Sequence, residues 1–434
     1  MKNRFWIFVF GICLGFGICN LGFSYNIYWA NLHSHTSLSD GQGMVDEAYF
    51  YARDSAHIDV LAITDHTHYL TEVGYQYTRD VAEQFTEPGR FVALAGQEFG
   101  SLGAFGHFST FEADMLYPYS VNGLELFYNW IAEHKAISQF NHPRAGDFKN
   151  LVFNRNGNKY ATMIEVVNGS GTYTPYYEEL YILALNNGWH VAPVANQDNH
   201  RKKWGNATTT LGQIPLTGIW ADTLTKEKIL EAMLNKRVYA VEVKPANDRI
   251  YLRDYSIGNT KMGDVYYTTD KNISINLSVD AINDFYKIYL YRNGVIADSV
   301  VVDTNYVNIT FSDTMTNGYY FIKGIQQDGD RFWTAPIWVI NRAGPTGIEA
   351  WPNPIRTTSQ IRYPETYGAA TMTIYTMEGK QVYKKYQSRQ PVIFNWDGVS
   401  DKGVRLENGI YYVVIKVHIG NGDKIYKGKV ALLR

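Results

Sequence analysis

Cysteine is almost absent from this sequence of 434 residues. Its only two cysteines, Cys13 and Cys19, both lie within residues 1–24. That segment resembles a removable export signal, so the mature chain is expected to carry no thiol. Disulfide bonds, thiolate catalysis and cysteine-ligated zinc are then excluded. Any bound metal ion must be held by imidazole and carboxylate groups.

An excess of charge of one sign is also missing, because 40 Lys and Arg residues nearly balance 42 Asp and Glu residues. The formal net charge of -2 gives no overall electrostatic reason to bind nucleic acid or an anionic membrane. A local cationic site, such as a metal cluster, stays open. With 45% hydrophobic and 19% charged residues the chain is globular in composition. Its length predicts two or three domains.

Apolar runs long enough to span a membrane are lacking too. The run Phe5–Ile18 follows Lys2 and Arg4 and is short for a membrane span. Residues 1–24 are therefore predicted to be a signal peptide, with a membrane anchor and a lipid-anchored Cys19 as alternatives. The expected mature protein is exported through the periplasm, is secreted or at the cell surface, and has no membrane span.

Between about Asn26 and Val243, short apolar runs alternate with amphipathic stretches. Such alternation predicts a parallel sheet or an α/β barrel, with the chemistry at the C-terminal ends of the strands. Thr225 is placed to cap the last helix. The expected strands are Ile27–Leu32, Ile58–Thr64, Phe91–Ala95, Ala136–Phe140, Met163–Val167 and Val191–Ala195, and the expected helices are Val45–Ala56, Leu124–His134, Tyr177–Leu185 and Lys226–Lys236.

After about Pro245 the pattern becomes that of half-buried strands. Asn293-Gly294 between two apolar runs predicts a hairpin. We expect a β-sandwich over residues 246–342 and, after a short link, a second β-module over 347–434. The clearest strands are Ile273–Val279, Tyr319–Ile325, Trp333–Ile340, Met372–Met377, Ile410–Val417 and Lys424–Leu432, with a turn at Glu378-Gly379.

Metal-ligand residue types follow most of the strands expected before Val243. His33 and His35 end the first strand, and residues i and i+2 of a strand point the same way. Glu98 is expected to end the third strand and His107 to lie in the loop after it. Nine ligands are too many for one tetrahedral ion and suit two or three divalent ions, with Zn, Mn or Fe preferred over Ca or Mg. The set is His33, His35, Asp40, His66, Glu98, His107, His142, Asp198 and His200.

Other polar residues fit ordinary structural roles better. Arg144, beside His142, could grip a phosphate or be a plain surface arginine, and both interpretations stay open. His68 is expected at the surface, although it could touch substrate. His57, His134, His190 and His418 lie at turns, element ends or in the tail and are assigned no chemistry.

The ligand motifs resemble those of the PHP (polymerase and histidinol phosphatase) superfamily over roughly Asn26 to Val243. The resemblance implies a distorted (β/α)7 barrel over residues 25–244 with a di- or trinuclear site. It also implies three ligand sets: His33, His35, Glu98 and Asp198; Glu98, His107 and His142; and Asp40, His66 and His200. Within the superfamily the chain most resembles CehA/McbA-type metallohydrolases, which often carry a following β-domain.

The last module, about Gly347 to Arg434, is similar to the type IX secretion sorting domain. The similarity rests on Pro352-Asn353-Pro354, Trp396-Asp397-Gly398 and the stretch Asn408–Tyr412. It implies that the export machinery is a partner. Trp351 stands where a tyrosine is often found, so a retained FlgD-like Ig module is the alternative.

These features together predict a secreted metal-dependent hydrolase that uses a metal-bridged hydroxide, with Glu98, Asp198 and Arg144 as catalytic residues. Ions about 3.5–4 Å apart lower the pKa of a shared water and bind the substrate's oxygens. A phosphoesterase acting on a small phosphorylated or ester substrate is favoured. The alternatives are an exonuclease acting on short oligonucleotides, a carbamate or amide-ester hydrolase, and a non-catalytic cell-surface binding protein.

Overall fold

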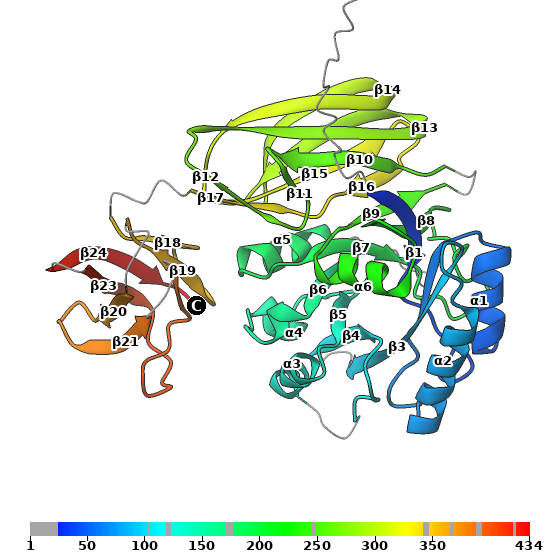
Figure 1. The fold of residues 1–434 in the computed structure, drawn as a ribbon, viewed down its shortest axis with the longest axis horizontal. Helices are drawn as coiled ribbons and strands as arrows, with labels where there is room; N and C mark the ends of the chain where they lie inside the picture. The colour runs from blue at the N-terminus through cyan, green and yellow to red at the C-terminus, as the bar shows by residue number, and fades with distance from the viewer. Residues whose placement is uncertain are drawn as a thin grey trace, which may run out of the picture.

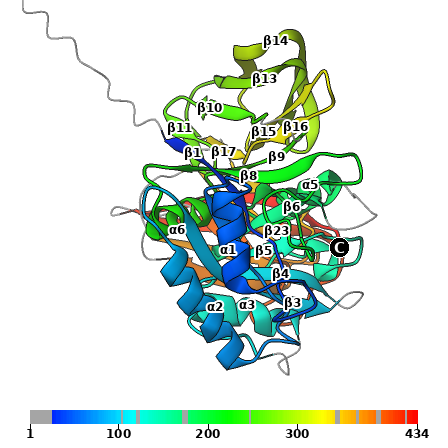
Figure 2. The same ribbon diagram turned by 90° about the vertical axis from the view of Figure 1, so that its right-hand side faces the viewer.

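The computed structural model describes residues 25–101, 105–118, 123–169, 177–244, 248–341, 347–364, 369–387, 393–419 and 422–434. An α/β part is followed by two β parts (Figures 1 and 2), which confirms the predicted order of domain types. The expected signal peptide, with Cys13 and Cys19, lies outside the described residues. None of the helices in the described ranges is long and apolar enough to cross a membrane.

The α/β part contains two groups of parallel strands. β1, β2 and β3 pair in parallel, as do β5, β6 and β7, and β4 joins the groups by pairing antiparallel with β3 and β5. The strands are β1 (Asn26–Asn31), β2 (Val60–Ile63), β3 (Val92–Ser101), β4 (Gly106–Phe111), β5 (Ile137–Asn141), β6 (Ala161–Asn168), β7 (Ala192–Asn196), β8 (Ile214–Ala221) and β9 (Val238–Val243).

The helices lie between these strands along the chain. The side chain of Thr225 accepts a hydrogen bond from the N–H of Lys228, so the predicted helix cap is confirmed. The helix α2, the strands β4, β8 and β9, and the short turns α4 and η1 were not predicted. The helices are α1 (Val45–Asp54), α2 (Glu72–Phe85), α3 (Leu124–Glu133), the short turn α4 (Phe148–Leu151), the 3-10 turn η1 (Gly157–Lys159), α5 (Glu178–Asn186) and α6 (Lys226–Leu234).

The segments that continue β1 and β7 run side by side. The N–H of Asp198 donates to the carbonyl of His33 at 2.9 Å, and the N–H of His35 donates to the carbonyl of Asn199 at 2.9 Å. These contacts bring the ends of the first and last parallel strands together, as in a barrel. β8 pairs antiparallel with β1, and β9 with β8. The count of seven strand–helix units stays a prediction.

The first β part continues the sheet of the α/β part, because β16 (Arg331–Trp333) pairs antiparallel with β9. Asn293 and Gly294, with φ of 51° and 80°, form the predicted hairpin between two long strands. The prediction of one strand over Trp333–Ile340 is wrong. Pro336 interrupts it, since proline has no N–H for the ladder. The other strands are β10 (Tyr251–Ile257), β11 (Thr260–Lys261), β12 (Val265–Thr268), β13 (Asn272–Arg292), β14 (Val295–Thr314), β15 (Gly318–Gln326) and β17 (Ile337–Asn341).

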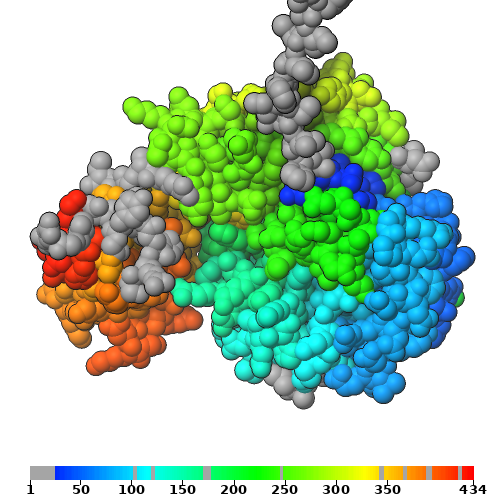
Figure 3. All heavy atoms as spheres, viewed as in Figure 1, coloured from blue at the N-terminus to red at the C-terminus, as the bar shows by residue number. Residues whose placement is uncertain are grey.

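The C-terminal part is a separate lobe with its own core (Figure 3). A three-stranded and a four-stranded sheet enclose this core, as expected for a β-sandwich. Gly379 has a φ of 83° and forms the predicted turn. The strands are β18 (Glu349–Trp351), β19 (Ser359–Arg362), β20 (Ala369–Tyr375), β21 (Gln381–Gln387), β22 (Ile393–Trp396), β23 (Gly409–Ile419) and β24 (Gly422–Leu432).

Candidate metal centre

The structure brings all nine predicted ligand residues together at one end of the parallel strands. They fall into four overlapping groups whose ligand atoms lie within 4.8 Å of one another. Two residues differ from their expected local placement. His107 lies on β4 rather than in a loop, and Glu98 lies inside β3 rather than at its end. The groups are His35, Asp40, His66 and His200; His33, His142 and Asp198; His33, His35 and Glu98; and His66, Glu98 and His107.

Glu98 lies at the centre of the cluster, with only 1% of its surface exposed. Its two carboxylate oxygens together contact five imidazoles, which is the arrangement of a bridging carboxylate. Oε1 lies 3.3 Å from His33 Nε2, 3.1 Å from His107 Nδ1 and 3.4 Å from His142 Nε2, and Oε2 lies 3.4 Å from His35 Nε2 and 3.0 Å from His66 Nδ1.

Four ligand atoms surround one point in the buried interior. His33 Nε2 and His35 Nε2 lie 3.3 Å apart, and Asp198 Oδ1 lies 3.4 Å from the first and 3.1 Å from the second. Glu98 completes the group at 3.3 and 3.4 Å. Bonds of 2.0–2.1 Å to a tetrahedral zinc ion place its ligands about 3.3 Å apart. The spacing of this group therefore fits a transition-metal ion.

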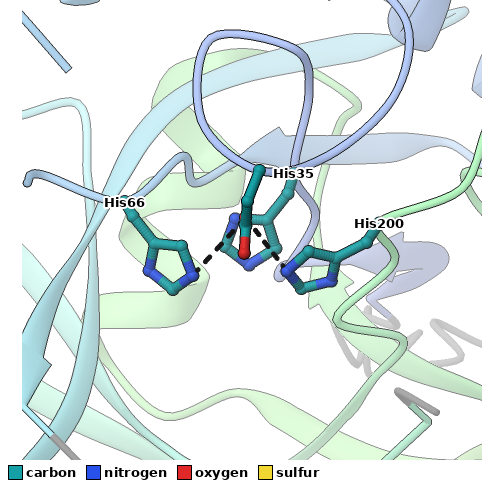
Figure 4. A group of neighbouring side chains, drawn as sticks. His35, His66 and His200 are labelled. Carbon is teal, nitrogen blue, oxygen red and sulfur yellow. Dashed lines mark ion pairs between the residues drawn. The ribbon is translucent and has the colours of Figure 1, made fainter. Parts of the chain in front are cut away.

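A second group is more exposed. The ring of His35 stacks between those of His66 and His200, with ring centroids 4.5 and 4.2 Å away (Figure 4). Asp40 Oδ1 lies 3.2 Å from His200 Nε2 and 3.7 Å from His66 Nε2. Asp40 is 43% exposed at its side chain, so this group faces solvent. It contains the third ligand set that the resemblance implies, with His35 added.

A buried glutamate that sequence reasoning missed supports these ligands. Glu165, on β6, is fully buried, and its Oε1 lies 2.9 Å from His33 Nδ1. Its Oε2 accepts hydrogen bonds from the N–H of His142 at 2.7 Å and from Asn168 at 2.9 Å. A proton on His33 Nδ1 would be held by this carboxylate, leaving the Nε2 lone pair free for a metal ion.

Asp65 positions the loop that carries Asp40. Its Oδ1 accepts the N–H of Thr36 at 2.7 Å, and its Oδ2 accepts the hydroxyl of the same threonine at 2.6 Å. The hydroxyl of Ser39 also donates to Asp65. Asp65 directly precedes the candidate ligand His66 and is not among the nine predicted ligands. Its 1% exposure and the three donor groups that it accepts from one loop identify it as a structural carboxylate.

Two of the candidate ligands have unusual backbone conformations. His142 has a φ of 27° and directly follows β5, and Asp198 has a φ of 46° and lies two residues after β7 ends. The left-handed region costs a residue with a side chain about 1–2 kcal/mol. Backbone strain of this kind concentrates at functional sites, where surrounding contacts hold it in place.

Burial and neighbouring charges pull the pKa values of the cluster in opposite directions. Burial disfavours the charged form of Glu98, yet His33, His107 and His66 hold its pKa well below its usual value. Burial and His33 act in the same opposed way on Asp198, whose pKa is also well below its usual value. Burial lowers the pKa of His35. The ionised carboxylates and the neutral His35 are in the forms that bind metal ions. Despite burial, the neighbouring carboxylates raise the pKa values of His33, His66 and His142, so metal binding would have to displace protons from these imidazoles.

The buried ligand atoms of the cluster also fit bound metal ions better than hydrogen bonds with one another. His35 Nδ1 is a buried atom without a hydrogen-bond partner in the described part of the chain, and Glu98 Oε2 is buried with only the imidazole nitrogens of His66 and His35 beside it. Buried polar atoms normally have such partners, and orphaned ones call for an unplaced ion or water. Because Nε2 of His33 also faces Nε2 of His35 across 3.3 Å, the cluster is better satisfied by cations than by its own contacts.

The remaining sequence candidates lie outside the ligand groups. Arg144 is exposed, and its guanidinium makes no ion pair with any described residue. It lies near Tyr177, whose pKa is raised by burial and by Glu165, while Arg144 lowers it. His68 is exposed at the rim, with its ring centroid 5.0 Å from that of His66. His57, His134, His190 and His418 belong to none of the groups.

Comparisons with known proteins give only weak similarities. No family model and no curated protein matches the sequence. One similar solved structure is a two-domain protein from Bacteroides vulgatus containing a predicted PHP-like metal-dependent phosphoesterase, with 16% identity, a TM-score of 0.42, and coverage of 72% of this chain and 96% of that one. The titin Ig tandem A164–A165 has 14% identity and a TM-score of 0.22, covering 42% of this chain and 96% of its own.

Proposed function

We propose that this chain is a metal-dependent hydrolase of the PHP type that cleaves phosphoric esters, exported to the cell surface or beyond. The observation that carries the proposal is Glu98, whose two oxygens lie 3.0–3.4 Å from five imidazoles. A single metal ion does not need so many ligands around one carboxylate. A cluster of two or three Zn, Mn or Fe ions does.

Each ligand set would hold one of the ions. His33, His35, Glu98 and Asp198 would hold a buried ion, and Glu98 with His107 and His142 a second. Asp40, His66 and His200 would hold a third at the solvent-facing side, where His35 also lies. When bound, such ions supply an activated water and neutralise charge on the oxygens of the ester.

The protein's own residues orient that chemistry. Glu165 fixes the orientation of the His33 ring and the backbone of His142. Arg144 is exposed beside the site, where a guanidinium can bind two oxygens of a phosphoryl group at once. No cysteine follows residue 24, so a thiolate nucleophile is excluded, and a metal-activated water would be the nucleophile. We therefore assign Glu98 and Asp198 to metal binding and catalysis and Arg144 to substrate binding.

The other reactions of the superfamily remain competing proposals for the same site. An exonuclease would have to bind a strand near the centre, and a carbamate or amide-ester hydrolase would not need a cationic group such as Arg144. A non-catalytic binding protein has no need of ligands that so closely match metal spacing.

Parallel assays distinguish these activities. The full chain without residues 1–24 would be loaded with Mn or Zn and given phosphomonoester, phosphodiester, carbamate ester and short oligonucleotide substrates. We expect turnover of a phosphoric ester, lost on chelation and in Glu98→Gln. Turnover of the carbamate alone would refute the choice of substrate. No turnover of any substrate by fully loaded protein would contradict the assignment as a hydrolase.

A further inference from the structure

A large groove separates the α/β part from the C-terminal sandwich. It has a volume of about 920 Å³ and is lined from both sides. One wall consists of α3, the segment 149–156 and α5, and the other of residues 356–358 with β21, β22 and the chain after them. Figure 1 shows the C-terminal part beside α3, α4 and α5. The hydroxyl of Thr357 donates to the carbonyl of Asn187 at 2.7 Å and ties the walls together.

Six cationic side chains line this groove, against two acidic ones, Glu125 and Asp397. This is a local excess in a chain whose net charge is -2. A cleft lined by one sign of charge focuses the field and attracts counter-ions. The cations are Lys149 and Arg155 on the α/β wall, and Arg356, Lys385, Arg405 and Arg434 on the opposite wall.

None of these six cations forms an ion pair with a described residue. Other cations on the same molecule are paired, such as Arg53 with Asp54, Lys202 with Glu47 and Arg253 with Asp280. Within the groove, burial and then the neighbouring Arg405 lower the pKa of Arg434, and Asp397 offsets part of the repulsion between the two arginines. The guanidinium of Arg434 donates only to backbone carbonyls of described residues, those of Asp397 and Leu406. An anionic occupant would relieve that repulsion.

The backbone beside the groove is strained, and buried contacts hold it there. Phe148, Lys149, Asn150 and Leu151 all have φ between 53° and 56°. Left-handed conformation costs each such residue about 1–2 kcal/mol. The side chain of Asn187 donates to the carbonyls of Asn150 and Leu151 at 3.0 and 2.9 Å. This turn presents the Lys149 side chain at the groove.

The uncharged lining indicates which kind of anion fits. It is rich in carboxamides and hydroxyls, which both donate and accept hydrogen bonds, as sugar hydroxyls require. Phe153 and Tyr383 are its only aromatic residues, whereas single-stranded nucleic acids are bound by successive stacked aromatics. The polar residues are Asn129, Asn150, Asn154, Asn156, Asn187, Asn395, Thr357, Thr358 and Ser400. Asn154, Asn187 and Thr357 already donate to protein oxygens, whereas the side chains of Asn395 and Thr358 bond to no described residue and can bind a ligand.

We propose that this groove binds an acidic polysaccharide, with the cations on its carboxylates and the carboxamides on its hydroxyls. The site is separate from the metal centre, and the proposal does not depend on the hydrolase activity. The groove would hold the protein on an anionic glycan, while the metal centre would carry out its reaction at a separate site of the protein.

Binding of galacturonic acid oligosaccharides to the full chain without residues 1–24 tests the proposal. Galactose oligosaccharides of equal length serve as the neutral probe, and a single-stranded oligonucleotide as the competing polyanion. The groove variant is Lys149→Gln with Lys385→Gln. The matched control is Lys159→Gln with Lys427→Gln, which removes the same charges from exposed, unpaired lysines of the same two parts outside the groove.

We expect the acidic oligosaccharide to bind, and the groove variant to weaken it by about tenfold or more. The control should change it less than about twofold, and the neutral probe should not bind comparably. Equal losses in both variants would overturn the proposal, as would no binding or equal binding of the neutral probe. Tighter, groove-dependent binding of the oligonucleotide would also overturn the assignment to a polysaccharide. Metal content should be the same in all three proteins.

Discussion

His33 Nδ1 lies 2.9 Å from Oε1 of Glu165, and both side chains are fully buried. The carboxylate thereby determines which nitrogen of His33 carries the proton. Nε2 is left to face Glu98, Asp198 and His35 at 3.3–3.4 Å. A glutamate that contacts no substrate can in this way control the strength of a metal site.

Glu165→Gln is expected to weaken metal binding about 10–100-fold, because an amide cannot hold the proton of His33 Nδ1 as a carboxylate does. The measurement is a competition titration of zinc against a chelator. Glu133→Gln, which changes an exposed glutamate of the same part of the fold, is the control and should leave the affinity unchanged. Equal affinities in the two variants would show that Glu165 only fills space.

Glu98→Gln and Asp40→Asn are expected to remove different numbers of ions. Glu98 contacts ligands of every proposed set, so its loss should release more than one ion per chain. Among the described residues, Asp40 forms ion pairs only with His66 and His200, so its loss should release at most one ion. Elemental analysis after dialysis gives the counts. Identical counts for the two variants would argue against Glu98 as a bridge.

Arg144→Gln is expected to raise KM for a phosphoric ester about tenfold while changing kcat much less, because binding of the substrate's oxygens is lost in both ground and transition states. Arg144 is exposed, so the fold should tolerate the change. Steady-state kinetics at full metal loading provide the measurement. An unchanged KM would return Arg144 to the status of an ordinary surface arginine.

His190 predicts a pH dependence of stability away from the metal centre. Burial among neighbours, and then nearby Lys236, lowers its pKa to about 3, and its ring stacks on Trp338 with centroids 4.2 Å apart. Between its ordinary pKa of about 6.5 and about 3, the unfolded chain binds a proton that the folded chain does not. Stability is therefore lost as the pH falls through this window.

His190→Phe keeps the stacked ring and removes the titration. The Tm of the variant relative to the wild type should therefore rise as the pH falls from about 6.5 toward about 3. Thermal unfolding at several pH values measures the difference. A difference that stays constant across this window would contradict the assigned pKa.

Eight of the nine candidate ligands could be predicted because they lie in or just beyond short apolar strands, where side-chain direction follows from period two. Asp40 lies in the loop after β1, so strand periodicity does not account for it. Glu165 was missed because it lies between Ile164 and Val166 in a strand whose pattern is typical of a buried hydrophobic core. The sequence does contain a signal for Glu165, because a lone acidic residue in a fully buried strand must have a polar partner. Which partner it has depends on packing between distant segments.

There are also physical reasons why the sequence did not predict α2 and β4. α2 buries Tyr75, Thr78, Val81 and Ala82, so its inner face contains too few large apolar residues to show a helical period. β4 pairs antiparallel with β3 and β5, each of which belongs to a group of parallel strands. No local pattern in His107–Phe111 distinguishes such a strand from a loop. Conversely, Asn293-Gly294 fixed a hairpin locally, because its two positive φ values are available to few residue pairs.

The most direct test of the account is the metal content of the purified wild-type chain. Elemental analysis should find two or three equivalents of zinc, manganese or iron, and their removal by a chelator should abolish hydrolysis that the same metal restores. A protein that purifies with no transition metal, and takes up none at micromolar concentrations, would contradict the claim that these imidazoles and carboxylates form a metal centre.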